Sequence, residues 1–143
     1  LPISPAKLAY EHLEMKRFIE KHRLTAFRMN PHFPVNTLLL MRGAVAAEME
    51  GKLDLYIDAG LRAMWEEGVK MDDPETYAAF FTANGLDGAA LLARTQDQEV
   101  KDRLVANTEA AVSRGTFGIP TFFVGEEIFF GKDRLAQVEE ALG

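Results

Sequence analysis

Three stretches of the sequence carry residue types and spacing that could bind a ligand. The first is Gly118-Ile119-Pro120-Thr121, which directly precedes a β-rich run. A cis peptide bond between Ile119 and Pro120 would turn the Ile119 amide and carbonyl outward, where they could pair with an extended peptide ligand. A trans proline at an ordinary strand start explains the same residues equally well, so alone this motif is weak.

The second stretch, residues 130–134, reads Phe-Gly-Lys-Asp-Arg and lies where a predicted strand gives way to a helix. The amides of a helix N-terminus could hold a carboxylate while Asp133 binds an ammonium group. These are the two charges at one end of an amino-acid-like ligand. A solvated turn in which Asp133 only caps the helix is the alternative. Because twelve residues separate Pro120 from Lys132, enough for one hairpin, both motifs could line one groove.

The third stretch, residues 28–37, contains two prolines and several polar groups between two predicted elements. Each proline fixes φ and removes a donor, so the segment is stiffer than a plain linker requires. A stiff connection in which Asn36 only caps a helix would explain it. Alternatively, it binds a substrate through a carboxylate-binding arginine, two hydrogen-bonding side chains and an apolar wall: Arg28, Asn30, His32 and Phe33.

The composition is that of a globular protein and excludes several functions. The 143 residues are 48% hydrophobic and 27% charged, and no apolar run is long enough to span a membrane. A net charge of -6 repels phosphate backbones, so we expect no nucleic-acid partner. The absence of Cys excludes disulfides, thiolate metal sites and a cysteine nucleophile from these residues, and with only three His we expect no metal.

Periodicity and capping residues predict the elements that must position these stretches. Between residues 37 and 115 the only proline is Pro74, and apolar residues recur at spacings of three and four. The last 28 residues are β-rich around Gly125-Glu126-Glu127, which is typical of a hairpin. We predict helices at 6–22, 37–50, 53–67, 74–83, 87–94, 97–114 and 133–142, and strands at 25–29, 120–124 and 128–130.

A hairpin of this kind needs further strands to form a stable sheet. Two strands alone are marginal in water, and five of these hairpin residues are Phe or Ile. The sequence starts at Leu1-Pro2-Ile3, without Met or a signal peptide. We therefore expect one or more strands to come from a segment upstream of Leu1.

Gly-Ile-Pro-Thr before the hairpin, Phe-Gly-Lys-Asp-Arg before the last helix and the order of elements resemble the kappa class of glutathione transferases. Residues 30–37, Asn-Pro-His-Phe-Pro-Val-Asn-Thr, followed by Met41-Arg42-Gly43-Ala44, resemble the 2-hydroxychromene-2-carboxylate isomerase family more closely. The resemblance covers nearly the whole chain. It implies an α/β fold: a thioredoxin-like domain, residues 1–36 and 116–143, interrupted by an all-helical insertion, residues 37–115.

The resemblance also implies what is missing and what is bound. The family begins with a strand–helix–strand unit, absent from these residues, that carries the serine meeting the glutathione sulfur, so no catalytic residue is named here. The Ile119 backbone beside cis-Pro120 would bind the cysteinyl part of glutathione. The γ-glutamyl end would be held by four residues after the hairpin: Phe130, Gly131, Lys132 and Asp133.

The implied activity is a glutathione-dependent cis–trans isomerisation in the degradation of aromatic compounds such as naphthalene. The glutathione thiolate would add to a ring-opened aromatic carboxylate, allow rotation about the resulting single bond, and leave. Arg28 is the candidate for the substrate carboxylate. We expect a cytoplasmic homodimer. The alternatives are a kappa-class-like glutathione transferase, a thiol–disulfide oxidoreductase with a Cys-x-x-Cys motif upstream, and a non-catalytic binding module formed by the helical region.

Overall fold

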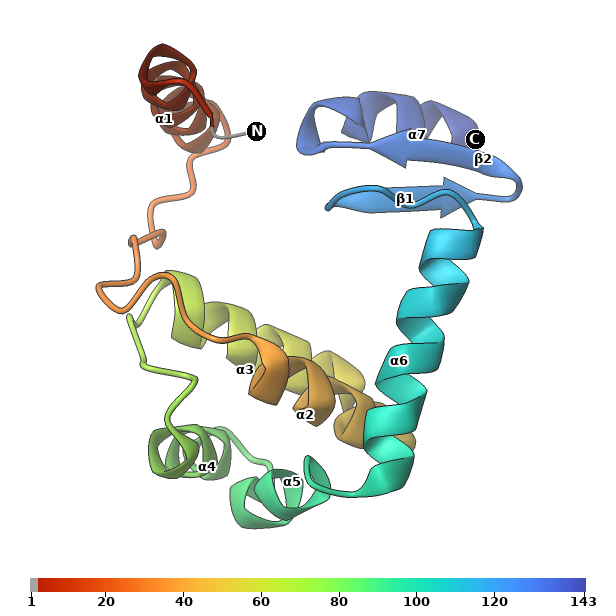
Figure 1. Ribbon diagram of the computed structural model, residues 1–143. Coiled ribbons are helices and arrows are strands. Elements are labelled where there is room, and N and C mark those ends of the chain that lie inside the picture. Colours follow the sequence, from red (N-terminus) through yellow and green to blue (C-terminus); the bar gives the residue numbers. More distant parts are fainter. Residues whose placement is uncertain (1–2) are drawn as a thin grey trace. The chain divides into compact units, whose positions relative to one another are not determined.

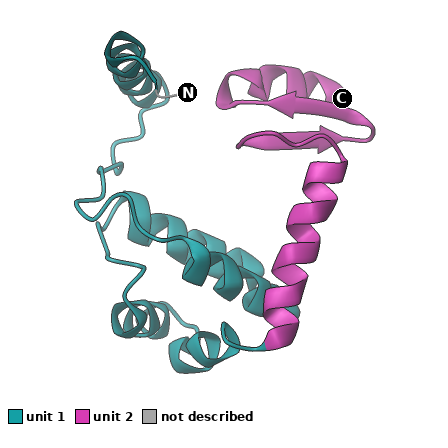
Figure 2. Cartoon of the chain, viewed as in Figure 1, with its two compact units in different colours: residues 1–97 teal, residues 98–143 magenta. Residues whose placement is uncertain are grey.

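The computed structural model describes residues 3–143; Leu1 and Pro2, at the start of the predicted first segment, lie outside the described residues. The chain divides into two compact units, Leu1–Asp97 and Gln98–Gly143, shown in Figure 2. Within residues 3–143, no helix combines the length and the apolar character that a membrane span requires.

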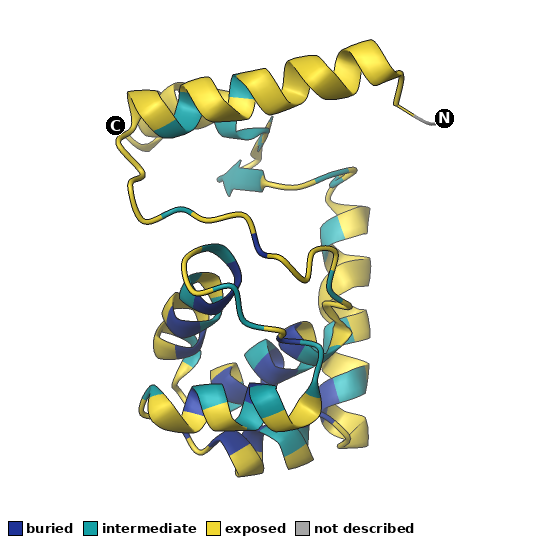
Figure 3. Ribbon diagram, turned by 90° about the vertical axis from the view of Figure 1, so that its left-hand side faces the viewer, coloured by how far each residue is buried: buried dark blue, intermediate teal, exposed yellow. Residues whose placement is uncertain are grey.

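The first unit begins with α1, Pro5–Lys21. Ser4 caps it: its Oγ accepts a hydrogen bond from the Lys7 amide at 3.3 Å, and Pro5 occupies the first helical position. None of its residues is buried (Figure 3), and Leu8 and Leu13 are exposed although they are apolar. The core of this unit is therefore built by the helices that follow.

Four helices form that core: α2 (Leu38–Met49), α3 (Leu53–Trp65), α4 (Pro74–Ala83) and α5 (Gly88–Arg94). Helix α2 packs against α3 and α5, and α4 packs against the same two helices (Figure 1). Their buried side chains are mainly apolar and include residues from all four helices. The predicted helices are confirmed, with ends that differ by at most two residues from those expected.

Two buried tyrosines lie at the centre of these helices. The Tyr56 hydroxyl donates to the Leu40 carbonyl at 2.8 Å and lies 3.0 Å from the Tyr77 hydroxyl, which therefore donates to it. The Tyr56 ring stacks on Phe81 at 4.3 Å. Burial raises the pKa of Tyr77 to about 12 and, together with the neighbouring Tyr77, raises that of Tyr56 still more. Both phenols thus stay neutral, as this hydrogen-bonded pair requires.

Short polar side chains set the helix starts, as the sequence predicts. Asp73 Oδ2 accepts hydrogen bonds from the Thr76 hydroxyl and amide at 2.6 and 2.9 Å, which hold the pKa of Asp73 below its usual value. Asn36 Oδ1 accepts from the Leu38 amide at 3.0 Å, although the residue directly before α2 is Thr37. These bonds satisfy amides that have no partner within the helix itself.

The second unit contains α6 (Gln98–Ser113), a two-stranded antiparallel sheet and α7 (Leu135–Leu142), which packs against β1. Strands β1 (Thr121–Val124) and β2 (Glu127–Phe130) pair with Thr121 opposite Phe130. Their tight turn contains Gly125, whose φ of 57° lies in the left-handed region that favours glycine. The predicted hairpin is confirmed.

One predicted element is absent, and one helix starts later than expected. Residues 25–29 form no strand: the Phe27 amide bonds to the Leu24 carbonyl at 3.1 Å, which closes a turn, and the Arg28 amide bonds to the carbonyl of Trp65 in α3 rather than to a strand. The last helix starts at Leu135 and not at Asp133, because residues Lys132–Arg134 form a single 3-10 turn, η1. Asp133 does not cap it; its carboxylate pairs with Arg134 at 3.0 Å.

Candidate ligand-binding site

The hairpin joins two of the predicted motifs at one end of the sheet. The Ile119–Pro120 bond is cis, as one interpretation of the sequence predicted. The Pro120 carbonyl accepts a hydrogen bond from the Gly131 amide at 3.0 Å, one residue beyond the Thr121–Phe130 pair. The segment that ends in Pro120 and the segment that begins at Gly131 are therefore adjacent, as the length of the hairpin indicated.

Among residues 3–143, Ile119 is the most exposed of the large apolar residues, at 89%. Within residues 3–143, its backbone amide and carbonyl make no hydrogen bond. The neighbouring backbone is fixed: the Thr121 hydroxyl donates to the Gly118 carbonyl at 2.6 Å, and a Cβ on Gly118 would lie 2.7 Å from the Phe130 ring. The Ile119 peptide groups thus form a short, exposed edge that could pair with an extended chain.

Gly131 has an unusual backbone conformation, and three charged residues follow it directly. Gly131 has a φ of 102°, a conformation that L side chains rarely adopt, and a Cβ there would lie 2.5 Å from Asp133 Oδ1. The Asp133 side chain is exposed and ion-pairs with Arg134. A ligand ammonium could share this carboxylate, while the glycine lets the backbone come close to a ligand.

Arg28 lies in the first unit, on the segment that leads to the double-proline loop. Its amide donates to the Trp65 carbonyl at 2.6 Å, and its Nη1 donates to the carbonyls of Thr25 and Phe27 at 2.8 and 2.7 Å. These bonds fix the guanidinium at the surface. Within residues 3–143, Nη1 is the one guanidinium nitrogen of Arg28 that makes a hydrogen bond. Nη2 and Nε are therefore available to bind an anion.

Asn30 holds the loop that carries His32 and Phe33. Its side chain is buried, with 2% exposure; Nδ2 donates to the Val69 carbonyl at 2.9 Å, and Oδ1 accepts from the His32 amide at 2.8 Å. Its amide group is thus bonded within the chain. His32 and Phe33 are exposed, and the Phe33–Pro34 bond is cis. The structure places Asn30 as a positioning residue beneath two exposed side chains.

Replacing Asn30 with alanine is expected to destabilise the protein by about 2 kcal/mol, because it removes a buried side chain and leaves the partly buried Val69 carbonyl and His32 amide without their partner. Asn107→Ala, at an exposed position of α6, is the matched control and should stay within about 0.5 kcal/mol of the parent. Urea unfolding followed by circular dichroism measures both. Equal stability of the two variants would contradict the positioning role.

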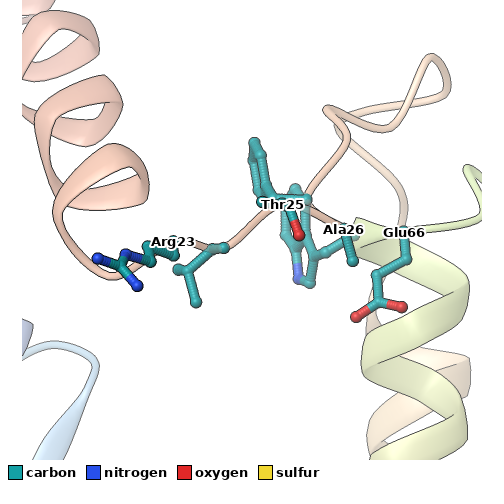
Figure 4. A pocket seen from close by; sticks show the side chains of 7 residues that line it. Arg23, Thr25, Ala26 and Glu66 are labelled. Atoms are coloured by element: carbon teal, nitrogen blue, oxygen red, sulfur yellow. The ribbon is translucent and has the colours of Figure 1, made fainter.

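An aromatic pocket, shown in Figure 4, is lined by residues 23–27 together with Trp65 and Glu66, so Arg28 directly follows its last lining residue in that segment. It measures about 370 Å³, with Arg23 and Glu66 on opposite sides and Thr25 and Ala26 between them. The Phe27 ring stacks on the Trp65 ring, with 6.1 Å between the ring centroids. The Phe33 ring also lies next to Trp65, tilted, with a centroid distance of 6.0 Å. Such a pocket offers a planar apolar wall with one cation, Arg23, and one anion, Glu66, at its edges.

Trp65 is not among the site residues predicted from the sequence. The residue is only partly buried, and its two aromatic neighbours lie more than thirty positions earlier in the chain. A tryptophan at helical spacing carries no signal for such long-range contacts.

The predicted site residues fall into two groups. Arg28, Asn30, His32 and Phe33 lie in the unit Leu1–Asp97, whereas Ile119, Pro120 and residues 130–133 lie in the unit Gln98–Gly143. The structure brings the members of each group together. Within residues 3–143, no three His, Asp or Glu side chains gather closely enough to hold a metal ion.

Comparisons with known proteins agree with this architecture. The chain is 30% identical over 139 residues to a 2-hydroxychromene-2-carboxylate isomerase of Pseudomonas sp. (strain C18), and 27% identical over 139 residues to the enzyme of that name from Pseudomonas putida. Each alignment covers 96% of this chain but only 63% and 66% of the respective relatives. The chain thus spans somewhat less than two thirds of their length.

A solved structure of a 2-hydroxychromene-2-carboxylate isomerase superposes with a TM-score of 0.80 at 28% identity, covering 96% of this chain and 66% of that one. These similarities confirm the resemblance to such isomerases that the motifs indicated. The sequence model of the DSBA-like thioredoxin domain matches residues 1–143. The predicted α/β, thioredoxin-like fold is confirmed, and the chain belongs to the DSBA-like thioredoxin domain family.

Proposed function

We propose that the whole protein is a glutathione-dependent cis–trans isomerase acting on 2-hydroxychromene-2-carboxylate-type intermediates of aromatic degradation. The observation that carries the proposal is the exposed Ile119 backbone beside the cis proline Pro120. The Pro120 carbonyl accepts a hydrogen bond at 3.0 Å from the Gly131 amide, where the second segment of the site starts. The names of the similar proteins support the reaction type. Because the chain spans only part of those relatives, the proposal concerns the whole protein.

Glutathione supplies the thiol, and this chain supplies its binding groups. The Ile119 amide and carbonyl pair with the cysteinyl residue as a strand would. The γ-glutamyl end carries one carboxylate and one ammonium. Gly131 and Lys132 face the carboxylate, Asp133 takes the ammonium, and Phe130 forms the apolar side. The exposed Asp133 carboxylate and the missing Cβ of Gly131 support this arrangement.

The reaction is an isomerisation, so the substrate and the product contain the same atoms. The thiolate sulfur forms a bond to one carbon of the conjugated double bond, and the electron pair moves into the carbonyl system of the substrate. The former double bond is now single and rotates. The electron pair then returns, the carbon–sulfur bond breaks, and the thiolate leaves unchanged. The protein's part is to hold the substrate carboxylate and to stabilise the negative charge of the intermediate.

The aromatic pocket suits such a substrate. Phe27 and Trp65 form a stacking wall for an aromatic ring, with Phe33 packed against the same indole. Arg28, fixed through Nη1, binds the carboxylate with its remaining donors. His32 supplies a hydrogen bond, and Asn30 positions the loop that carries it. A homodimeric assembly and a cytoplasmic location complete the proposal and rest on the resemblance to the family.

Replacing Ile119 with proline tests the glutathione site directly. The variant loses the amide that pairs with glutathione, so its dissociation constant is expected to rise by about tenfold. Ile119→Ala keeps the amide and is the matched control, with unchanged affinity. Both variants should fold, because the side chain is exposed and its amide bonds to no described residue. Isothermal titration of the whole protein gives the constants, and equal binding to the proline variant would overturn the assignment.

A further inference from the structure

A second pocket in the unit Leu1–Asp97 is not used by the proposed reaction. It measures about 310 Å³ and is shallow. Its lining comes from Asn36 and the start of α2, the segment between α3 and α4, the start of α4, and Gln96, two residues after α5. Four polar side chains and two apolar ones determine its chemistry: Arg42, Lys70, Asp72, Gln96, Leu38 and Pro74.

An internal bond network fixes the acid of this pocket. Asp72 Oδ1 accepts from Lys70 Nζ at 2.6 Å, and Oδ2 accepts from the Asn36 amide at 3.1 Å. Both bonds hold the pKa of Asp72 below its usual value, the one from Lys70 most strongly. Asp72 therefore stays anionic and has one cation, Lys70, as its partner.

Arg42 is a second cation of this pocket and takes no part in the hydrogen bonds to Asp72. It is half-buried in the pocket wall and has no ion-pair partner among residues 3–143. Together with Lys70 and Asp72 it gives the pocket one net positive charge, in a chain whose net charge is -6. An arginine fork with free donors matches a carboxylate in two parallel hydrogen bonds.

We propose that this pocket binds a small monocarboxylate with an apolar body. The Arg42 guanidinium takes the carboxylate, the Gln96 amide offers a further hydrogen bond, and Leu38 and Pro74 cover the apolar part. The single positive charge matches one carboxylate rather than two. The volume lies near the lower end of the range for ligand sites, about 300–1,000 Å³, and suits a molecule the size of benzoate. The proposal is independent of the isomerase activity.

Heteronuclear NMR of the isotope-labelled whole protein, titrated with benzoate, tests the proposal residue by residue. Saturable shifts are expected at the amides of Asn36, Leu38, Arg42 and Gln96, which line the pocket. Benzamide has the same shape without the charge and should leave these amides unmoved. Absence of saturable shifts there, or equal shifts with benzamide, would overturn the proposal.

Variants separate this pocket from the aromatic one beside Arg28. Arg42→Gln is expected to weaken the benzoate response of the pocket amides roughly tenfold, and Arg42→Lys to restore part of it, because a lysine keeps the charge but not the fork. Arg28→Gln should leave these amides responding as in the parent. If Arg42→Gln binds benzoate unchanged, or if Arg28→Gln abolishes the shifts, the ligand occupies another place and the proposal is wrong.

Discussion

Replacing Gly43 with alanine is expected to destabilise the protein by about 3 kcal/mol. A Cβ on this residue of α2 would run into the hydroxyls of both Tyr56 and Tyr77. These rings are buried at 3% and 0% exposure among α2, α3 and α4, so they cannot move into solvent. The added methyl group therefore combines overpacking with the loss of a buried hydrogen bond, each of which costs about 1–3 kcal/mol.

Gly60→Ala is the matched control for that variant. Gly60 also lies inside a core helix, α3, but a Cβ there would meet only Phe81 Cζ, at an ordinary contact distance of 3.8 Å. Alanine lowers the chain entropy of the unfolded state, so this substitution should stabilise the protein by about 0.5–1 kcal/mol. Chemical unfolding followed by far-ultraviolet circular dichroism measures both. Opposite signs are the expected result, and a neutral Gly43→Ala would contradict the packing described for the tyrosine pair.

Helices were the part of the fold that the sequence predicted best, because their signals are local. Ser4 before Pro5 and Asp73 before Pro74 mark helix starts, and in the structure each side chain accepts a hydrogen bond from the amide three residues on. The strand expected at residues 25–29 failed for the opposite reason. A strand needs a partner, and an apolar run does not reveal whether one exists; here the Arg28 amide bonds to Trp65 instead.

The same distinction separates the two groups of candidate site residues. The contact of Pro120 with Gly131 follows from the length of one hairpin, so the sequence could predict it. The burial of Asn30 depends on Val69, 39 residues further along the chain, and no local pattern indicates it. A polar residue in a proline-rich loop therefore suggested a ligand contact where the structure shows an internal anchor.

Removal of glutathione is expected to abolish the isomerase activity of the whole protein. Without the thiol no covalent adduct forms, and the double bond of the substrate keeps its geometry. Loss of a covalent catalytic group lowers rates by many orders of magnitude in well-studied enzymes, so a fall of at least about 10³-fold is expected here. S-Methylglutathione offers the same binding groups with a blocked sulfur, so it should occupy the site without restoring the rate.

The most direct test is the rate at which the whole protein isomerises 2-hydroxychromene-2-carboxylate, followed by absorbance. The protein is first desalted, and the rate is measured with glutathione, with S-methylglutathione and with neither compound. The account predicts turnover with glutathione alone and inhibition when the methylated analogue competes with it. Undiminished turnover without either compound would contradict the glutathione-dependent mechanism, although the protein would still be an isomerase. Absence of turnover under all three conditions would contradict the isomerase itself.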